Sequence, residues 1–437
     1  MAQKEGTKVP VSRLARLSKM GALVAKVAGN VAYQGAQEWR KGQSPSLNQL
    51  LLQPKNIEQL AQKLSHLRGA AMKLGQLLSM DAGELLPAEL SGLLARLRND
   101  AEPMAHKQLV AILAAQWGPN WIDKFSHFEL RPFASASIGQ VHLAYDETVK
   151  KCAVKVQYPG IKDSISSDVD NVASLLKLSG LLPSHLNLAP LYQEAKQQLL
   201  AEASYLTEGR YISAYQAQLK SSEFVLPVVD TDLSNDDILV MSYLEGVAID
   251  TCTNQSQAVC DSLASRLIGL FFQELFGFKL MQTDPNFANY LYQPDTNKIG
   301  LLDFGATRAI PEHISQGYLA LINAGAQQDQ SAMLDAARAI GFFKQDIDPH
   351  YLEQVLTIFA LACEPLRHDG PYHFGQSQLA QRIKAAGMAV NRDKSQWHTP
   401  PVDALFIHRK LAGLYLLAAK LDAKVDVREL FAAYRLG

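Results

Sequence analysis

The sequence lacks the features of a disulfide-stabilised, zinc-binding or membrane-spanning protein. Four cysteines occur among 437 residues, and none stands at the close paired spacing of a zinc ribbon or a redox dithiol. We therefore expect reduced thiols, as in a cytosolic compartment. No run reaches the ~18 apolar residues of a spanning helix, because Glu274 and Lys279 interrupt the best candidate, residues 267–281. The N-terminus lacks the apolar run of a signal peptide.

A surplus of one charge sign is also missing. The 42 basic and 43 acidic residues give a net charge of -1, which argues against nucleic-acid binding through bulk charge. Apolar residues make up 48% of the chain, as in ordinary folded proteins. At roughly 150 residues per domain, the length allows two to three domains. The sequence contains no internal repeat.

Residues 1–45 depart from this charge balance, since they hold eight Lys or Arg residues and two Glu. In VSRLARLSKMGALVAKVAG the apolar residues recur at helical spacing, and the basic ones lie largely off that stripe. Such a helix suits the surface of an anionic membrane. The pattern also fits a helix that packs on its own protein with its basic face in solvent. Both alternatives stay open.

The order of helix and strand patterns predicts an α+β protein. Residues 46–118 have helical periodicity. FASASIGQVHLAYD is typical of a hairpin, and KKCAVKVQYPG of a strand that ends in a turn. We expect a long helix from about residue 168 to 220, and then strand, polar turn and strand in FVLPVVDTDLSNDDILVMSYLEG. From residue 247 the chain reads as mostly helical, interrupted by MQTDPNFANYLYQ and KIGLLDFGA.

These patterns predict four segments: a basic amphipathic segment at 1–45, a helical extension at 46–128, a small mixed lobe at 129–245 and a larger helical lobe at 246–437. A nucleotide could sit between two such lobes.

Lys155 in AVKV lies on an apolar strand after the small-residue turn ASASIGQ. Because a buried lysine is costly unless it is paired, its ammonium either extends to solvent or meets a carboxylate and phosphates. In protein kinases such a lysine pairs with a helix glutamate and holds two phosphates of ATP. Glu202 and Glu208 follow on the predicted helix. The two glutamates are six residues apart, which is roughly 600° of helical rotation, so their side chains face different directions. They therefore cannot both contact Lys155 in the same way.

Asp284, Asn289 and Asp303 have the types and spacing of a metal and phosphate site. The five residues from Asp284 to Asn289 equal the interval in the kinase catalytic loop. Asp303, in DFG after a predicted strand, suits a magnesium ligand, because Mg²⁺ prefers hard oxygen atoms and keeps several waters. Upstream, ILVMSYLEG resembles a last strand and hinge. We expect Met241, Ser242 and Leu244 to form part of the nucleotide site at this hinge. The backbone groups of Ser242 and Leu244 are expected to hydrogen-bond to the edge of the adenine ring.

Each motif alone has an ordinary explanation, since DFG occurs by chance, TDP makes a good turn and a strand lysine can lie at an edge. In this order and at this spacing, together they predict nucleotide binding.

The chain resembles the UbiB, or AarF-type, atypical kinases, and within them the coenzyme Q biosynthesis branch. The resemblance rests on RGAAMKLGQLLSMD, PFASASIGQVHLA, VKVQYPGI, ISSDVDN, QTDPNFANYLY, LLDFGATR and ALFIHRKLAGLY, which span nearly the whole chain. KLGQ and QTDPN are the most specific of these motifs. The resemblance implies a bilobal protein-kinase-like fold with additional N-terminal helices. We assigned no chemistry to HRKLAG.

The resemblance also implies roles for individual residues. The KxGQ helix would cover the cleft and point Lys73 and Gln76 at the nucleotide, and an alanine-rich loop would replace the glycine-rich one. The implied set comprises loop residues Ala134, Ser135, Ala136 and Ser137, phosphate-binding Lys155 with Glu208 as its partner, Asp284 at the catalytic-base position, and the Mg²⁺ ligands Asn289 and Asp303.

Three positions depart from the family pattern. Ser135 replaces an alanine of the loop, and we expect this difference to change how tightly nucleotide binds. Gln282 stands where kinases have the catalytic-loop histidine, as is normal in this branch. The family's Glu-x-Asp motif reads Glu202-Ala203-Ser204, so Lys73 is expected to meet Glu202 alone.

A helix that covers the cleft would keep protein hydroxyls from the γ-phosphate. We therefore expect an ATP- and Mg²⁺-dependent ATPase or small-molecule kinase, and the resemblance implies that it supports ubiquinone synthesis at a membrane. A nucleotide-binding scaffold without turnover and a protein kinase are the alternatives. Expected partners are anionic lipid, isoprenoid precursors and ubiquinone-biosynthesis enzymes, and a homodimer stays open. We expect the cytoplasmic face of a bacterial inner membrane, or the mitochondrial inner membrane if the source is eukaryotic.

Overall fold

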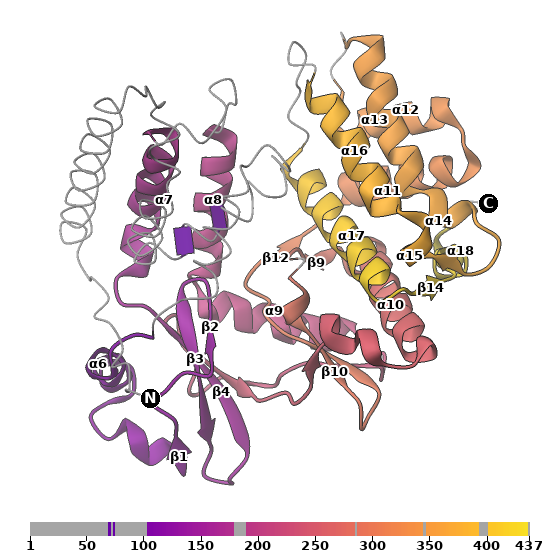
Figure 1. Ribbon diagram of the computed structural model, residues 1–437. Coiled ribbons are helices and arrows are strands. Elements are labelled where there is room, and N and C mark those ends of the chain that lie inside the picture. Colours follow the sequence, from indigo (N-terminus) through magenta and orange to yellow (C-terminus); the bar gives the residue numbers. More distant parts are fainter. Residues whose placement is uncertain are drawn as a thin grey trace, which may run out of the picture. The chain divides into compact units, whose positions relative to one another are not determined.

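The computed structural model describes residues 69–70, 73–74, 103–178, 189–284, 286–343, 347–392 and 401–435. The basic segment predicted at 1–45, most of the predicted helical extension and Gln76 lie outside these residues. The chain divides into two compact units (Figure 1). Unit 1 is Met1–Arg210 with Val228–Tyr243, and unit 2 is Tyr211–Pro227 with Leu244–Gly437. The four-segment division stays a prediction.

Unit 1 combines an antiparallel sheet with helices. Its elements are α6 (His106–Trp117), η3 (Trp121–Lys124), β1 (His127–Phe128), β2 (Ala134–Ser135), β3 (Gly139–Tyr145), β4 (Lys151–Gln157), α7 (Ile161–Leu178), α8 (Ala189–Glu202), the first part of α9 (Tyr205–Gln218), β6 (Val229–Asp230) and β7 (Ile238–Ser242).

The sheet of unit 1 has the strand order β1-β3-β4-β7-β6, with β2 paired to β3. The predicted hairpin and strand correspond to β2, β3 and β4. Five consecutive residues of β4, Ala153–Gln157, are buried, as expected of a central strand covered on both faces. Helix α9 packs on the sheet at Gly209, where a Cβ would make ordinary contacts of 3.5 Å with Val229 and 3.6 Å with Leu239.

The prediction of one long helix from about residue 168 to 220 is wrong. Helix α7 begins earlier, at Ile161, and the chain leaves helical geometry at Ala203–Ser204 between α8 and α9. Serine favours this break because its hydroxyl accepts a hydrogen bond from the Thr207 backbone N–H at 3.3 Å, as an N-cap does.

The strand, polar turn and strand predicted over residues 224–246 are confirmed in β6, the turn after it and β7, but the first stretch also contains a separate strand. Strand β5 (Phe224–Val225) belongs to unit 2, where it pairs in parallel with β11 (Lys298–Leu301). Strand β6 pairs with β7. Pro227 separates β5 from β6, and it cannot donate a hydrogen bond to a ladder.

Unit 2 is mostly helical, with short strands. The remaining elements of the chain lie in it: β8 (Val247–Ala248), η4 (Ile249–Asn254), α10 (Gln257–Phe272), the π-helical η5 (Gln273–Phe278), β9 (Leu280–Gln282), η6 (Phe287–Asn289), β10 (Tyr290–Gln293), β12 (Thr307–Ala309), α11 (Glu312–Gln327), α12 (Gln330–Ile340), α13 (Pro349–Ala362), α14 (Glu364–Arg367), β13 (Tyr372–His373), α15 (Phe374–Ser377), α16 (Leu379–Arg392), α17 (Val402–Lys420), β14 (Lys424–Val425), α18 (Val427–Leu430) and η8 (Ala432–Tyr434).

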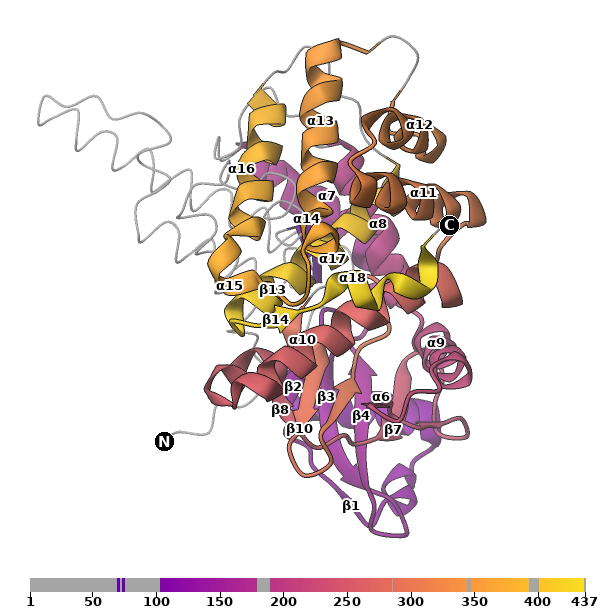
Figure 2. The ribbon, with the colours of Figure 1, turned by 90° about the vertical axis from the view of Figure 1, so that its right-hand side faces the viewer.

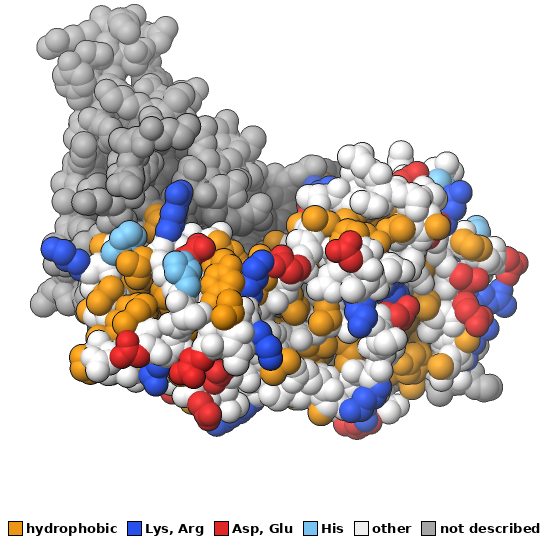
Figure 3. Space-filling model, turned by 90° about the horizontal axis from the view of Figure 1, so that it is seen from below, with side chains coloured by type: hydrophobic (Ala, Val, Ile, Leu, Met, Phe, Trp, Pro, Cys, Tyr) orange, Lys and Arg blue, Asp and Glu red, His pale blue; other side chains and the backbone are white. Residues whose placement is uncertain are grey.

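Helices α13 and α16 run alongside one another in unit 2 (Figure 2), and α17 packs against α16. Strands β9 and β12 form a small antiparallel pair, and β10 and β11 form a hairpin. Within the described part of the chain, no helix combines the length and the apolar character needed to cross a membrane. On the face shown in Figure 3, acidic and basic side chains are interspersed, which agrees with the net charge of -1.

Candidate functional site

Lys155 lies at the middle of the unit 1 sheet and is paired with Glu208. Its partners across the ladder are Val141 on β3 and Leu239 on β7. The Lys155 ammonium donates to both carboxylate oxygens of Glu208, each at 2.9 Å, and the two side chains are only 8% and 1% exposed. The Tyr205 ring lies 5.1 Å from the ammonium. The ammonium therefore does not extend to solvent.

A second buried cation, Lys73, contacts Glu202 at the end of α8. The other oxygen of Glu202 accepts a hydrogen bond from the Ser137 hydroxyl at 2.6 Å. Gly69, one helical turn before Lys73, packs on the same loop, because a Cβ there would lie 2.9 Å from the Ser137 carbonyl oxygen. Glu202 thus joins the KxGQ lysine to the alanine-rich loop. Glu202 and Glu208 serve different lysines.

The alanine-rich loop runs from β2 into β3. Ala134 and Ser135 are exposed strand residues, whereas Ala136 and Ser137 are half-buried. The Ala136 backbone N–H donates to the Gly139 carbonyl at 2.9 Å and closes the turn. A side chain at Gly139 does not fit, since its Cβ would lie 2.4 Å from the Val156 carbonyl oxygen. The loop therefore rests directly on the strand that carries Lys155.

Ser204, which replaces the family aspartate, has a structural role at the start of α9. Its hydroxyl donates to an Asp236 carboxylate oxygen at 2.8 Å and accepts from the Thr207 hydroxyl at 3.0 Å. Its carbonyl accepts from the Glu208 backbone N–H at 3.2 Å. Ser204 thereby helps to place Glu208 beside Lys155.

The hinge residues of β7 are partly committed to other contacts. The Ser242 backbone N–H donates to the Val228 carbonyl at 2.8 Å, so this donor is already used. Met241 pairs with Ala153 in the ladder and is half-buried. Leu244 belongs to unit 2. An adenine contact through the Ser242 backbone N–H would have to displace the Val228 carbonyl.

In unit 2, Asp284 and Asn289 contact each other. The Asn289 side-chain amide donates to an Asp284 carboxylate oxygen at 3.0 Å, and the Asn286 backbone N–H donates to the other at 3.3 Å. Asn289 is buried and Asp284 is half-buried. The five-residue spacing thus bends the loop so that one side chain orients the other.

The hairpin of β10 and β11 brings Asp303 near this loop. Tyr290, next to Asn289 in the chain, pairs with Leu301, and the Leu302 backbone N–H donates to the Asn289 carbonyl at 2.8 Å. Asp303 itself has a φ of 55°, the left-handed region that aspartate tolerates better than most residues. Such conformations recur at functional sites.

The oxygen atoms of Asn289 and Asp303 fit Mg²⁺ in chemical type. Because the Asn289 amide nitrogen faces Asp284, its side-chain oxygen is the atom that could bind a metal. In the part of the chain that the structure describes, no three His, Cys, Asp or Glu side chains form a metal cluster. Mg²⁺ at these residues would therefore complete its coordination with other oxygen atoms, such as those of water or phosphate.

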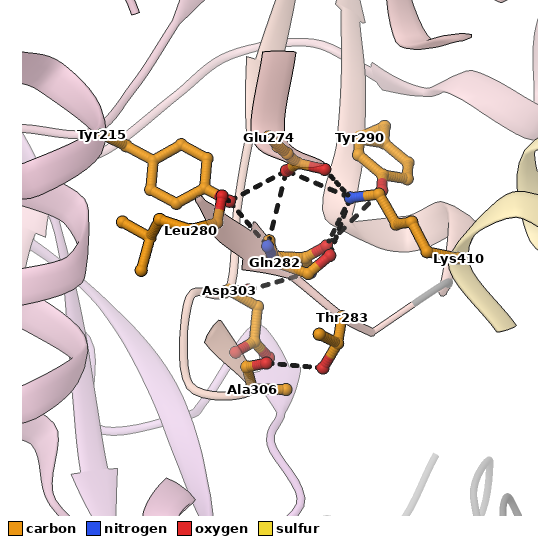
Figure 4. Close-up of polar contacts among 9 residues, drawn as sticks. All are labelled: Tyr215, Glu274, Leu280, Gln282, Thr283, Tyr290, Asp303, Ala306 and Lys410. Atoms are coloured by element: carbon orange, nitrogen blue, oxygen red, sulfur yellow. Dashed lines mark hydrogen bonds and ion pairs between the residues drawn. The ribbon is translucent and has the colours of Figure 1, made fainter. Parts of the chain in front are cut away.

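A buried polar network behind this loop has no counterpart in our sequence analysis (Figure 4). Lys410 of α17, in the HRKLAG stretch, donates to the Gln282 carbonyl at 2.7 Å and to its side-chain oxygen at 3.1 Å. The sequence did contain a pattern that indicates a buried lysine, because Lys410 lies four residues from both Phe406 and Leu414 on the buried stripe of its helix. A lysine on an apolar stripe needs a partner.

A family model described as an ABC1 atypical kinase-like domain matches residues 96–337, more than half of the chain. Atypical kinase COQ8, mitochondrial, of Saccharomyces cerevisiae is 36% identical over 435 residues, which cover 98% of this chain and 85% of that protein. This chain belongs to the ABC1 (UbiB) family of atypical kinases. Atypical kinase COQ8B, mitochondrial, of Rattus norvegicus is 34% identical over 436 residues, with 97% and 80% covered.

A solved structure agrees on the fold. The complex of Rv3197 with erythromycin from Mycobacterium tuberculosis superposes with a TM-score of 0.59 at 24% identity, covering 86% of this chain and 95% of that one. The resemblance to UbiB-type atypical kinases is confirmed, and with it the α+β kinase-like fold.

Proposed function

We propose that this protein binds ATP with Mg²⁺ and either hydrolyses it or transfers its γ-phosphate to a small acceptor. The observation that carries the proposal is the buried pair of Lys155 and Glu208. Burying two charges often costs more free energy than burying apolar residues of the same size, so such a pair contributes little to the stability of the fold. A phosphate-binding role for Lys155, held at a defined place by Glu208, would account for this cost in free energy.

In this proposal Lys155 and the loop 134–137 bind phosphate groups, while Asp284 orients the attacking hydroxyl or water. Asn289 and Asp303 would hold Mg²⁺, which neutralises developing charge on the phosphates. Asn289 also orients Asp284 through its amide, at 3.0 Å. The exposure of Ala134 and Ser135 leaves this part of the loop open to a ligand.

The contacts of Glu202 favour hydrolysis or a small acceptor over protein phosphorylation. Glu202 holds the Lys73 helix against the loop through Ser137, whose hydroxyl is thereby engaged. A protein substrate would have to break these contacts. The same contacts favour the second candidate, a nucleotide-gated scaffold without turnover, if they persist when ATP binds.

We further propose that the protein supports coenzyme Q biosynthesis at a membrane. Its relatives from Saccharomyces cerevisiae and Rattus norvegicus are named COQ8 and COQ8B and are mitochondrial. These names favour the mitochondrial inner membrane over a bacterial one. Association with anionic lipid, isoprenoid precursors, biosynthetic enzymes or a second copy of the chain remains part of the proposal.

The test is phosphate release from ATP and Mg²⁺, with and without liposomes that contain cardiolipin. Asp303→Asn should lower the rate at least about 100-fold, a typical loss when a group that stabilises developing charge is removed. Asp295→Asn is the matched control, since Asp295 is exposed in the turn of the same hairpin. Its rate should stay within about threefold of the native rate.

Phosphate release that rises with liposomes and disappears in Asp303→Asn would support a membrane-coupled ATPase. Bound nucleotide without release on any lipid would refute turnover and favour the scaffold. Labelled phosphate on a partner protein would instead favour a protein kinase. Lys155→Met should abolish nucleotide binding, whereas Lys151→Met, on the same strand but exposed, should not.

A further inference from the structure

Lys410 is buried in the interior of unit 2, where it reaches the strand that leads to Asp284. Its side chain is 2% exposed. The ammonium lies 2.7 Å from the Gln282 carbonyl oxygen, 3.1 Å from the Gln282 side-chain oxygen and 3.3 Å from one Glu274 oxygen. An ammonium has three N–H donors, so it can serve several acceptors at once.

The surroundings of Lys410 keep it charged. Burial alone would lower its pKa, but the Glu274 carboxylate and Tyr290 raise the pKa overall. The second Glu274 oxygen lies 3.2 Å from the ammonium, and the Tyr290 ring centroid lies 5.5 Å from it. Glu274 comes from the π-helical η5, a rare element that is frequent at functional sites.

Gln282 is held from its other side as well. Its side-chain N–H donates to the Asp303 carbonyl at 3.2 Å, and its backbone N–H donates to the Tyr215 hydroxyl at 2.6 Å. The Tyr215 ring packs on Phe304 with centroids 4.8 Å apart. One glutamine thus connects Lys410 on α17 to the backbone of the DFG stretch (Figure 4).

We propose that Lys410 is a positioning residue for the reaction. It acts through Gln282, whose side chain fixes the Asp303 backbone in its left-handed conformation and holds β9 against β12, so that Asp284 and Asp303 keep their places. Gln282 pairs with Thr307 in that ladder, and the neighbouring Thr283 hydroxyl donates to the Ala306 carbonyl at 2.6 Å. The expected effect of Lys410 on catalysis rests on the proposed function. The expected effect of Lys410 on the backbone of β9 and β12 is independent of the proposed function.

The test uses the full chain with Lys410→Met. Leu414→Ala is the matched control, because Leu414 is buried one turn away on the same helix and its truncation destabilises the core without touching Gln282. Hydrogen exchange is followed in peptides that cover residues 280–284 and 302–309, together with the kcat and KM of ATP hydrolysis.

We expect Lys410→Met to increase exchange at least about tenfold in these two peptides, and not in α11. We expect kcat to fall at least about tenfold with KM for ATP within about threefold, since small displacements of catalytic groups are costly. Leu414→Ala should show neither selective effect. Native exchange in Lys410→Met, or the same pattern in Leu414→Ala, would overturn the proposal.

A variant that does not fold would be replaced by Glu274→Gln combined with Lys410→Met. This double variant removes both charges of the pair, so no unpaired charge stays buried, and it still removes the ammonium donors to Gln282. If the native protein releases no phosphate, the proposed ATPase fails while the exchange measurement still decides the positioning role. Native ATPase with unchanged exchange in the variants would refute the positioning role alone.

Discussion

Replacing Lys155 by methionine removes the ammonium that donates to both oxygens of Glu208. The pair is 8% and 1% exposed, so solvent screens it little. Removing one partner of such a pair typically costs about 3–5 kcal/mol. A domain usually has only about 5–15 kcal/mol of stability. We therefore expect unit 1 to lose a large fraction of its free energy of unfolding in Lys155→Met.

The double variant Lys155→Met with Glu208→Leu should recover most of this loss. Apolar residues of similar size often replace a buried ion pair at no cost, or with a gain of about 1–4 kcal/mol. Nucleotide binding should stay absent in the double variant. Restored stability with lost binding would separate the pair's proposed ligand role from its part in folding.

The assay is urea unfolding followed by tryptophan fluorescence. Trp117 and Trp121 lie in unit 1, and Trp121 is buried. Trp39 and Trp397 lie outside the described residues, so both are first replaced by phenylalanine. The remaining fluorescence then follows unit 1, which matters because two units need not unfold together. A loss below about 1 kcal/mol in Lys155→Met, or a double variant as unstable as the single one, would refute this reasoning.

Two further predictions concern unit 1. Burial lowers the pKa of His142 from 6.5 to about 4, so the unfolded chain takes up this proton first on acidification. Unit 1 should therefore lose about 3 kcal/mol as the pH falls from about 6.5 to 4, and His142→Phe should remove that slope in urea unfolding. Gly139→Ala should cost about 1–3 kcal/mol, because its Cβ would lie 2.4 Å from the Val156 carbonyl oxygen. Gly277→Ala, with no atom within 4 Å of its Cβ, should be neutral by thermal unfolding, and equal effects of the two would contradict the clash.

Local sequence patterns predicted much of the secondary structure. The alternation in FASASIGQVHLAYD predicted β2 and β3, because side chains alternate along a strand, and the turn at Pro159-Gly160 marked the end of β4. The long helix failed at Ser204, where a capping hydroxyl outweighs the helical pattern on either side. Pro227 likewise divides a stretch that reads as one strand. A single capping or imino residue can decide such a break.

The candidate site was predictable in its residue types and less so in its contacts. Lys155 stands out as a charged residue on an apolar strand, whereas Asp284, Asn289 and Asp303 stand out by residue type and by a spacing like that of the kinase catalytic loop and DFG. Their roles as phosphate, base and metal residues stay predictions. Lys410 was missed because its partner, Gln282, lies 128 residues earlier in the chain.

The sequence by itself determined which residues can do chemistry, how the strands of unit 1 alternate and which family the chain resembles. These properties depend on side-chain type and short spacing. The family resemblance implied the pairs of Lys155 with Glu208 and of Lys73 with Glu202, and the tertiary structure shows both. Only the tertiary structure decided that Ser137 shares Glu202 with Lys73 and that Lys410 hydrogen-bonds to Gln282. A buried charge must find an opposite charge or an acceptor wherever the fold brings one near, and sequence distance does not enter that requirement.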